Sequence, residues 1–279
     1  MQNKIAVKNF SLKRTLTCGQ TFRVYERNGV YIYPYGNSVL ALRQEGDSLF
    51  YESFGEKLNE TEVKNLLGLN DNPDFINKYL KRRVPGFSKV INETLGIRIM
   101  RQNSFETVIS FMFSVQSAIP LIARRLNALS EIAGEKVQTP YGEFYLFPRS
   151  ENLRKLSDSE IRELKLGFRE KWFREFIERY DEKEIEKIAR LPFAEKEKEL
   201  LKIKGVGIKV AHCIMLFSMN ELSAFPVDVW IKRGMKTLFG ADGSVKKITR
   251  FGRELFGDFA GYAQEYIYYY IRNGAEGGT

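Results

Sequence analysis

Residues 200–233 read LLKIKGVGIKVAHCIMLFSMNELSAFPVDVWIKR, and Lys209 carries a charge early in this largely apolar run. Apolar residues spaced three and four positions apart predict a helix over 193–203 and a second helix over 208–219. Between them, KGVG at 204–207 has the composition of a tight turn. The segment therefore predicts two helices joined by a short hairpin, with Lys209 at the start of the second helix.

The turn of this hairpin has a pattern that suits a DNA phosphate. Gly205 and Gly207, on either side of Val206, let the backbone approach a partner closely. The amides of the turn and of the following helix N-terminus point outward as an anion site. Helix hairpins need glycine in any case, so the turn alone leaves a purely structural role open.

Lys209 begins a helix that is apolar nearly all round, with Cys213 one turn along on the same side. Partial burial and the positive end of the helix dipole both disfavour an ammonium group at this position. We therefore expect a neutral, nucleophilic amine. The alternative is a lysine whose amine reaches solvent or contacts a phosphate.

Asp228 stands just ahead of another predicted helix, WIKRGMKTLFG at 230–240. The Pro-Val-Asp entry predicts that Asp228 caps this helix, and the second oxygen of a capping carboxylate remains free. If the two helices pack as neighbours, Asp228 and Lys209 share one cleft. Such a pair would be able to stabilise a cationic sugar while the amine attacks it.

The composition narrows the class of protein. The 279 residues carry 44 basic and 35 acidic side chains, a net charge of +9, which permits a polyanionic partner without proving one. Cys18 and Cys213 are too few for a disulfide framework, a four-cysteine zinc site or an iron–sulfur cluster, and we expect no cofactor. The sequence has no apolar run of about 18 residues and no leader, so we expect a cytoplasmic protein without a membrane span.

Hydrophobic periodicity divides the chain into two parts. Residues 21–54 alternate β-branched or aromatic residues with polar ones, which predicts an antiparallel meander. After NETEV at 59–63, which has the pattern of a helix start, apolar residues recur three and four positions apart, for example throughout 157–180. We predict an α+β fold with a small antiparallel β-sheet domain over 1–75 and an all-helical region over 76–279.

The segment at 200–229 resembles the helix-hairpin-helix, Gly/Pro-rich and Asp motif of DNA base-excision glycosylases, with lysine at the position used by bifunctional members. Other segments resemble the 8-oxoguanine glycosylase branch and occur in that family's order. They are CGQTFR at 18–23, GIRIMRQNSFETVISFMFSVQS at 96–117, YGEFYLFP at 141–148, LKLGFREKWF at 164–173 and GDFAGYAQEYIYYY at 257–270.

This resemblance implies a sheet domain and a mostly α-helical, two-lobed region with the helix-hairpin-helix at about 190–220 and a lobe at 125–190 inserted. Duplex DNA containing oxidised guanine would bind across the cleft, with the damaged base flipped out, because its C1′ is inaccessible in a stacked duplex. Lys209 would displace the base, form a Schiff base with the opened sugar and allow β-elimination of the 3′ phosphate. Asp228 would steady the oxocarbenium ion. The resemblance also implies a monomer, associated with the nucleoid if the source is a prokaryote.

The resemblance also assigns residues to the flipped base. Gly19 matches a glycine whose carbonyl accepts a hydrogen bond from the protonated N7 of the oxidised purine, an approach that needs a residue without a side chain. Gln264 would read the Watson–Crick edge. Cys213 and Tyr268 would stack on the two faces of the base, with Phe217 in the same pocket. Without the resemblance, the aromatic stretch around Gln264 is typical of a core helix.

Further matches concern the rest of the DNA. Gln116 matches, in chemistry only, an asparagine that fills the space opposite the orphaned cytosine. Phe168 stands where the family has a tyrosine wedge, with Arg169 beside it as a cytosine contact; the alternative for Phe168 is a core phenylalanine. Leu121 replaces a second cytosine-reading arginine, so the sequence leaves the preference for the base opposite the lesion open. Trp230 replaces a phosphate-contacting histidine.

The hairpin backbone has a second role by resemblance. Gly205, Val206 and Gly207 would contact the DNA backbone. The carbonyls of Leu201, Ile203 and Val206 would hold a structural monovalent cation, and no catalytic metal is expected.

Other readings of the sequence compete with this one. A monofunctional alkylpurine glycosylase would keep Asp228 and hydrolyse with water, but Lys209 argues against it. A non-catalytic helix-hairpin-helix protein would bind duplex DNA with a steep salt dependence and leave every lesion intact. A glycosylase of the endonuclease III or adenine type is disfavoured because the C-terminal four-cysteine cluster is absent from the sequence.

Overall fold

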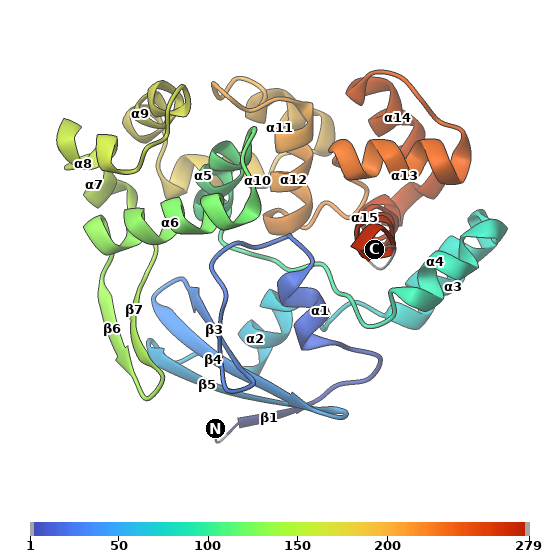
Figure 1. The fold of residues 1–279 in the computed structure, drawn as a ribbon, viewed down its shortest axis with the longest axis horizontal. Helices are drawn as coiled ribbons and strands as arrows, with labels where there is room; N and C mark the ends of the chain where they lie inside the picture. The colour runs from blue at the N-terminus through green and yellow to red at the C-terminus, as the bar shows by residue number, and fades with distance from the viewer. Residues whose placement is uncertain (1–2, 277–279) are drawn as a thin grey trace.

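An antiparallel sheet of five strands lies at the bottom of the view in Figure 1, beneath a body of helices. In this computed structural model, which describes residues 3–276, the strand order is β1-β5-β4-β3-β2. The strands are β1 Asn3–Ala6, β2 Tyr25–Arg27, β3 Val30–Tyr35, β4 Ser38–Glu45 and β5 Ser48–Gly55. The predicted meander corresponds to β2–β5, whereas β1, which pairs with β5, was not expected.

One face of this sheet is covered by two short helices, α1 Leu12–Thr17 and α2 Glu60–Leu66. Leu16 of α1 and Val63 of α2 are buried against strand residues such as Leu40 in one apolar cluster. Asn59 caps α2 in a capping box with Glu62, which confirms the predicted helix start.

The opposite face of the sheet is covered by a hairpin that was not predicted. Strands β6 Lys136–Thr139 and β7 Gly142–Tyr145 pair antiparallel, and Phe144 and Leu146 pack on Ile32 of β3 and Val39 of β4. The interpretation of residues 76–279 as all helical is therefore wrong at this hairpin. The reason is that the apolar outer face of β3 and β4 needs a cover, and the alternating residues of the hairpin supply it.

Helices make up the remaining body, and the predicted α+β fold is confirmed. The central helices α5 and α12 are buried along most of their length and belong to one large apolar cluster. The helices are α3 Pro73–Arg83, α4 Ser88–Glu93, α5 Ser104–Ser114, α6 Ile119–Ala133, α7 Ser150–Leu153, α8 Asp158–Glu163, α9 Arg169–Arg179, α10 Glu182–Ala189, α11 Phe193–Leu200, α12 Ile208–Ser218, α13 Val229–Phe239, α14 Val245–Phe256 and α15 Ala260–Glu276, with short 3₁₀ turns at Pro85–Phe87 and Gly257–Phe259.

The helical pattern over residues 157–180 is interrupted between α8 and α9. Lys165 and Gly167 in this break have left-handed backbone conformations, with φ of 50° and 61°. A helix cannot continue through such residues. The break places Phe168 at the exposed start of α9.

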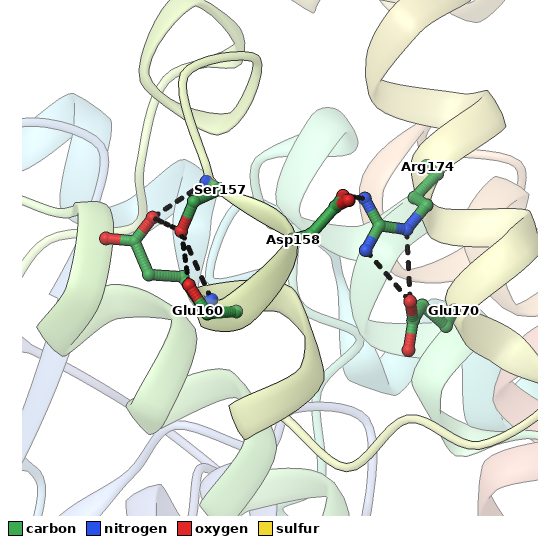
Figure 2. Close-up of polar contacts among 6 residues, drawn as sticks. Ser157, Asp158, Glu160, Glu170 and Arg174 are labelled. Atoms are coloured by element: carbon green, nitrogen blue, oxygen red, sulfur yellow. Dashed lines mark hydrogen bonds and ion pairs between the residues drawn. The ribbon is translucent and has the colours of Figure 1, made fainter.

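Side chains hold the two helices around this break, as Figure 2 shows. Ser157 and Glu160 form a capping box that fixes the start of α8. Arg174 of α9 donates hydrogen bonds to Asp158 of α8 at 2.6 Å and to Glu170, one turn earlier on its own helix, at 2.9 and 3.1 Å. The loop that carries Phe168 is thus anchored at both ends.

The predicted limits of the two domains, and of the inserted lobe, stay predictions, and residues 1–2 and 277–279 of those domains lie outside the described part. Among the helices of residues 3–276, none has the length and apolar composition that crossing a membrane requires.

Candidate active site

A cavity of about 780 Å³ lies between the segment after α1, the helices α5, α12 and α15, and the start of α13. Its volume falls in the range of about 300–1,000 Å³ that ligand pockets usually have. The structure brings most of the predicted site residues together in its wall. They are Gly19, Gln116, Gly205, Gly207, Lys209, Cys213, Phe217, Asp228, Gln264 and Tyr268.

The hairpin that carries Lys209 is confirmed, with α11 and α12 joined by the turn after Leu201. Lys209 lies in the first turn of α12 and is half-buried. Its Nζ is 5.1 Å from the centre of the Phe111 ring, which stacks on Phe217. The lysine interacts electrostatically with both Cys213 and Asp228. The amine thus enters the cavity between an aromatic wall and a carboxylate.

Asp228 caps α13, as predicted from the sequence. Its Oδ1 accepts a hydrogen bond from the amide of Ile231 at 2.8 Å. Burial raises the pKa of the Asp228 carboxyl, whereas the amides of Ile231 and Trp230 and the charge of Lys209 act in the opposite direction. A capping carboxylate therefore also borders the lysine, where it can stabilise positive charge on a bound molecule.

Cys213, Gly19 and Tyr268 form the part of the cavity predicted to hold a base. Burial raises the pKa of the Cys213 thiol to about 11, so it is a neutral, polarisable contact surface at physiological pH. Gly19 has φ of +102°, and a Cβ there would lie 3.2 Å from the Tyr268 hydroxyl oxygen. The positive φ and the nearby Tyr268 hydroxyl both favour glycine at position 19, even without a ligand.

Gln264 of α15 is buried, and within residues 3–276 its Oε1 has no hydrogen-bond partner. A buried amide oxygen without a hydrogen bond destabilises the fold unless a ligand donates one to it. The next residue, Glu265, is buried in the same wall and was missed from the sequence, as were Phe111 and Arg272. Glu265 was missed because a helix of this pattern usually carries its charged residues on the solvent face.

The two hairpin glycines differ in what surrounds them. A Cβ on Gly205 would lie 2.4 Å from the Trp172 ring of α9, and its φ is +86°. Gly207 lines the cavity. Among the described residues other than its chain neighbours, none lies within 4 Å of the position that a Cβ on Gly207 would take. Packing against Trp172 thus accounts for the absence of a side chain at position 205. The contacts of Gly205, Val206 and Gly207 with the DNA backbone stay predictions. Val206 is buried away from the cavity wall.

Phe168 and Arg169 are not part of the cavity wall. Phe168 is 49% exposed and meets Trp172 edge to face. The guanidinium of Arg169 is buried and donates to the backbone carbonyls of Val115 and Gln116, the latter at 3.0 Å. Arg169 therefore holds the loop on which Gln116 is exposed in a left-handed conformation, with φ of 51°. Its contact with cytosine stays a prediction.

The carbonyls predicted to hold a cation belong to the turn between α11 and α12. The carbonyl of Ile203 accepts a hydrogen bond from the Val206 amide at 3.0 Å, and Leu201 is exposed on the same turn. Backbone carbonyls are suitable ligands for a hard cation. Across residues 3–276, no group of three or more His, Cys, Asp or Glu side chains could hold a metal ion.

The positions that depart from the family pattern also have defined places. Trp230 is half-buried at the start of α13 and lines the cavity, and Leu121 is half-buried in the first turn of α6.

Comparison with known proteins identifies the family. Residues 3–108 match the family model of the 8-oxoguanine DNA glycosylase N-terminal domain. The chain is 36% identical to the 8-oxoguanine glycosylase/lyase of Clostridium acetobutylicum, solved with double-stranded DNA containing cytosine opposite 8-oxoguanine, over 96% of this chain and 94% of that one, with a TM-score of 0.90. The chain belongs to the 8-oxoguanine DNA glycosylase/lyase family.

Curated relatives place the same family in other organisms. The N-glycosylase/DNA lyase of Arabidopsis thaliana is 26% identical over 95% of this chain and 78% of its own length. A probable N-glycosylase/DNA lyase of Methanothermobacter thermautotrophicus is 28% identical over 66% of each chain. The resemblance to 8-oxoguanine glycosylase/lyases predicted from the sequence motifs is confirmed.

Proposed function

We propose that this protein excises 8-oxoguanine from duplex DNA and then cleaves the strand at the resulting abasic site. The observation that carries the proposal is the position of Lys209 beside Asp228 in one cavity, in a chain of this family. The Clostridium enzyme with a TM-score of 0.90 to this chain is named a glycosylase/lyase. A nucleophilic amine next to a carboxylate supplies both parts of that chemistry.

The reaction would begin when the unprotonated amine of Lys209 attacks C1′ of the flipped nucleotide. The C1′–N9 bond breaks, and its electron pair leaves with the base, which takes up a proton. Asp228 stabilises the positive charge that develops on the sugar. The attached nitrogen then loses one proton, and its lone pair forms the C=N bond of an iminium between Nζ and C1′. The C1′–O4′ bond breaks in the same step, and O4′ takes up a proton as the sugar ring opens. Loss of a proton from C2′ expels the 3′ phosphate by β-elimination.

Selection of the base would use other residues of the same cavity. The Gly19 carbonyl would accept a hydrogen bond from N7–H, which 8-oxoguanine has and guanine lacks. Gln264, whose Oε1 is without a partner in the described chain, would bind the Watson–Crick edge. Cys213 and Tyr268 would contact the two faces of the ring, with Phe217, which stacks on Phe111, in the same pocket.

Contacts with the duplex would lie around the mouth of the cavity. The Gly207 backbone is open to a phosphate, and exposed Phe168 is available to stack into the helix at the orphaned base. Gln116 would fill the vacated space. Arg169 would support it by holding the loop that carries Gln116. We expect a monomer in the cytoplasm, with the turn carbonyls 201, 203 and 206 binding a monovalent cation.

Borohydride trapping tests this function. Incubation with a duplex containing 8-oxoguanine and borohydride should give a covalent protein–DNA adduct, which Lys209→Gln should abolish. Lys187→Gln, which changes an exposed lysine of α10, is the matched control and should keep the adduct. Base release without an adduct would favour a monofunctional glycosylase, and binding without base release would favour a non-catalytic DNA-binding protein.

A further inference from the structure

The cavity contains a carboxyl group that the proposed reaction does not use. Glu265 of α15 is 2% exposed and lines the cavity one residue after Gln264. Over the described part of the chain, its Oε1 has no hydrogen-bond partner. A buried carboxyl oxygen without a hydrogen bond destabilises the fold. Because this oxygen belongs to a residue of the cavity wall, it points to a contact with a ligand.

The groups around Glu265 do not provide a full counter-charge. The Cys18 thiol interacts with the carboxyl, and Arg272, four residues before the end of α15, favours its charged form. Asp228 opposes that form across the cavity. Burial is the largest effect and raises the pKa of the Glu265 carboxyl to about 8.

The other titratable groups facing Glu265 are neutral at physiological pH. Burial raises the pKa of Cys213 to about 11 and that of Tyr268 to about 12, and it raises the pKa of Cys18 as well. Below about pH 8, Glu265 is therefore mainly an uncharged carboxylic acid. In this form it can donate a hydrogen bond through its O–H and accept one through its C=O, whereas a carboxylate accepts only.

The position of this acid defines what it can contact. Cys18, with which it interacts, directly precedes Gly19, and all three residues line the cavity. Under the proposed function, the Gly19 carbonyl faces N7–H of the oxidised purine. The carbonyl oxygens of that purine lie on either side of N7–H and need hydrogen-bond donors, and a backbone carbonyl cannot donate.

We propose that Glu265 is a further specificity-determining residue, whose protonated carboxyl donates a hydrogen bond to a carbonyl oxygen of the extrahelical oxidised purine. The inference rests on the proposed function, because it needs that base in the cavity. It predicts a role in base excision and none in cleavage of a site that has no base. It also predicts that ionised Glu265 cannot make the contact and repels the acceptor oxygen.

The experiment compares two duplexes, one with 8-oxoguanine opposite cytosine and one with a preformed abasic site. Glu265→Ala should lower kcat/KM for excision about tenfold, the equivalent of one hydrogen bond, and leave abasic-site cleavage within about twofold. Glu265→Gln, which keeps a donor, should retain excision. Glu26→Gln, on an exposed residue of β2, is the control for the same substitution outside the cavity.

The pH dependence gives a second readout, since kcat/KM reports ionisations of the free enzyme. Excision by the wild type should fall as pH rises above about 8, the pKa of Glu265, and the ratio of Glu265→Gln to wild type should rise by up to tenfold per pH unit there. The ratio of kcat/KM for Glu26→Gln to that for the wild type should not change with pH.

Failure of the proposed function and failure of the inference on Glu265 give different results. If the wild type leaves 8-oxoguanine in place, the proposed function fails and this inference fails with it. If the wild type excises the base, equal losses on both duplexes in Glu265→Ala, or a Glu265→Gln ratio independent of pH, would overturn the inference alone.

Discussion

The Asp228 carboxylate accepts a hydrogen bond from the Ile231 amide at 2.8 Å, so one side chain both starts helix α13 and borders the cavity that holds Lys209. A structural and a chemical role can therefore be separated by substitution, because asparagine caps a helix about as well as aspartate but carries no charge.

Asp228→Asn should keep the fold and lose the reaction. We expect the thermal midpoint to change by less than about 2 °C, since the cap remains. Excision should slow by about two orders of magnitude, as for loss of one group that stabilises transition-state charge. Single-turnover kinetics and thermal unfolding measure the two effects. Wild-type excision rates in Asp228→Asn would show that the carboxylate charge is not used.

The buried carboxyl of Glu265 should make stability depend on pH. Its pKa of about 8 in the folded chain compares with 4.5 in its ordinary state, so between these values the folded chain holds one proton more than the unfolded chain. The free energy of unfolding should therefore fall as pH rises through this window, by roughly 1 kcal/mol per pH unit, with no further loss from this group above about pH 8.

Glu265→Gln should remove this contribution, because its amide does not titrate. Urea unfolding of both proteins at several pH values from 5 to 8.5 measures the difference. The variant should gain stability relative to the wild type across the window, and parallel curves for the two proteins would contradict the assignment.

The hairpin glycines should respond differently to alanine. At Gly205, a Cβ would meet the Trp172 ring at 2.4 Å, and φ is +86°, so Gly205→Ala should lower the free energy of unfolding by roughly 1–3 kcal/mol. At Gly207, where φ is −91° and space is open, the loss should stay below about 1 kcal/mol. Denaturant unfolding compares the two variants, and equal losses would contradict the packing account of Gly205.

The enzyme should have low selectivity for the base opposite the lesion. Leu121 has no group that can hydrogen-bond cytosine, and the Arg169 guanidinium is occupied by backbone carbonyls. We expect excision opposite cytosine and opposite adenine to differ by less than about tenfold, the value of one hydrogen bond. Leu121→Arg should increase the preference for cytosine. Single-turnover excision opposite all four bases measures this, and a strong cytosine preference in the wild type would contradict it.

Much of the fold could be predicted because periodicity and caps are local. The strands after Thr21, the start of α2 at Asn59 and the helices around Lys209 each depend on residues close in sequence. The hairpin β6–β7 could not be predicted in the same way. It is stable because it covers an apolar sheet face formed more than 90 residues earlier in the chain, around Ile32 and Val39.

Part of the site could also be predicted, because some of its residues give a local signal in the sequence. Lys209 and Asp228 stand out because each is a charged residue in an apolar segment, and their meeting in the cavity follows from the packing of the helices. Glu265 gave no such signal, since two of the groups that interact with it, Cys18 and Asp228, lie far away in sequence. For Gly205 the sequence left both a phosphate contact and a structural role open, and the contact with a tertiary neighbour, Trp172, supplies the structural role.

The central claim is that the Lys209 amine forms the covalent bond to C1′. Peptide mapping of the borohydride-reduced adduct tests it most directly, because a modified Lys209 resists trypsin and joins residues 205–209 to residues 210–232 in one peptide. We predict a sugar remnant on that peptide at Lys209. A remnant on another lysine or on the N-terminal amine, with Lys209 unmodified, would contradict the account.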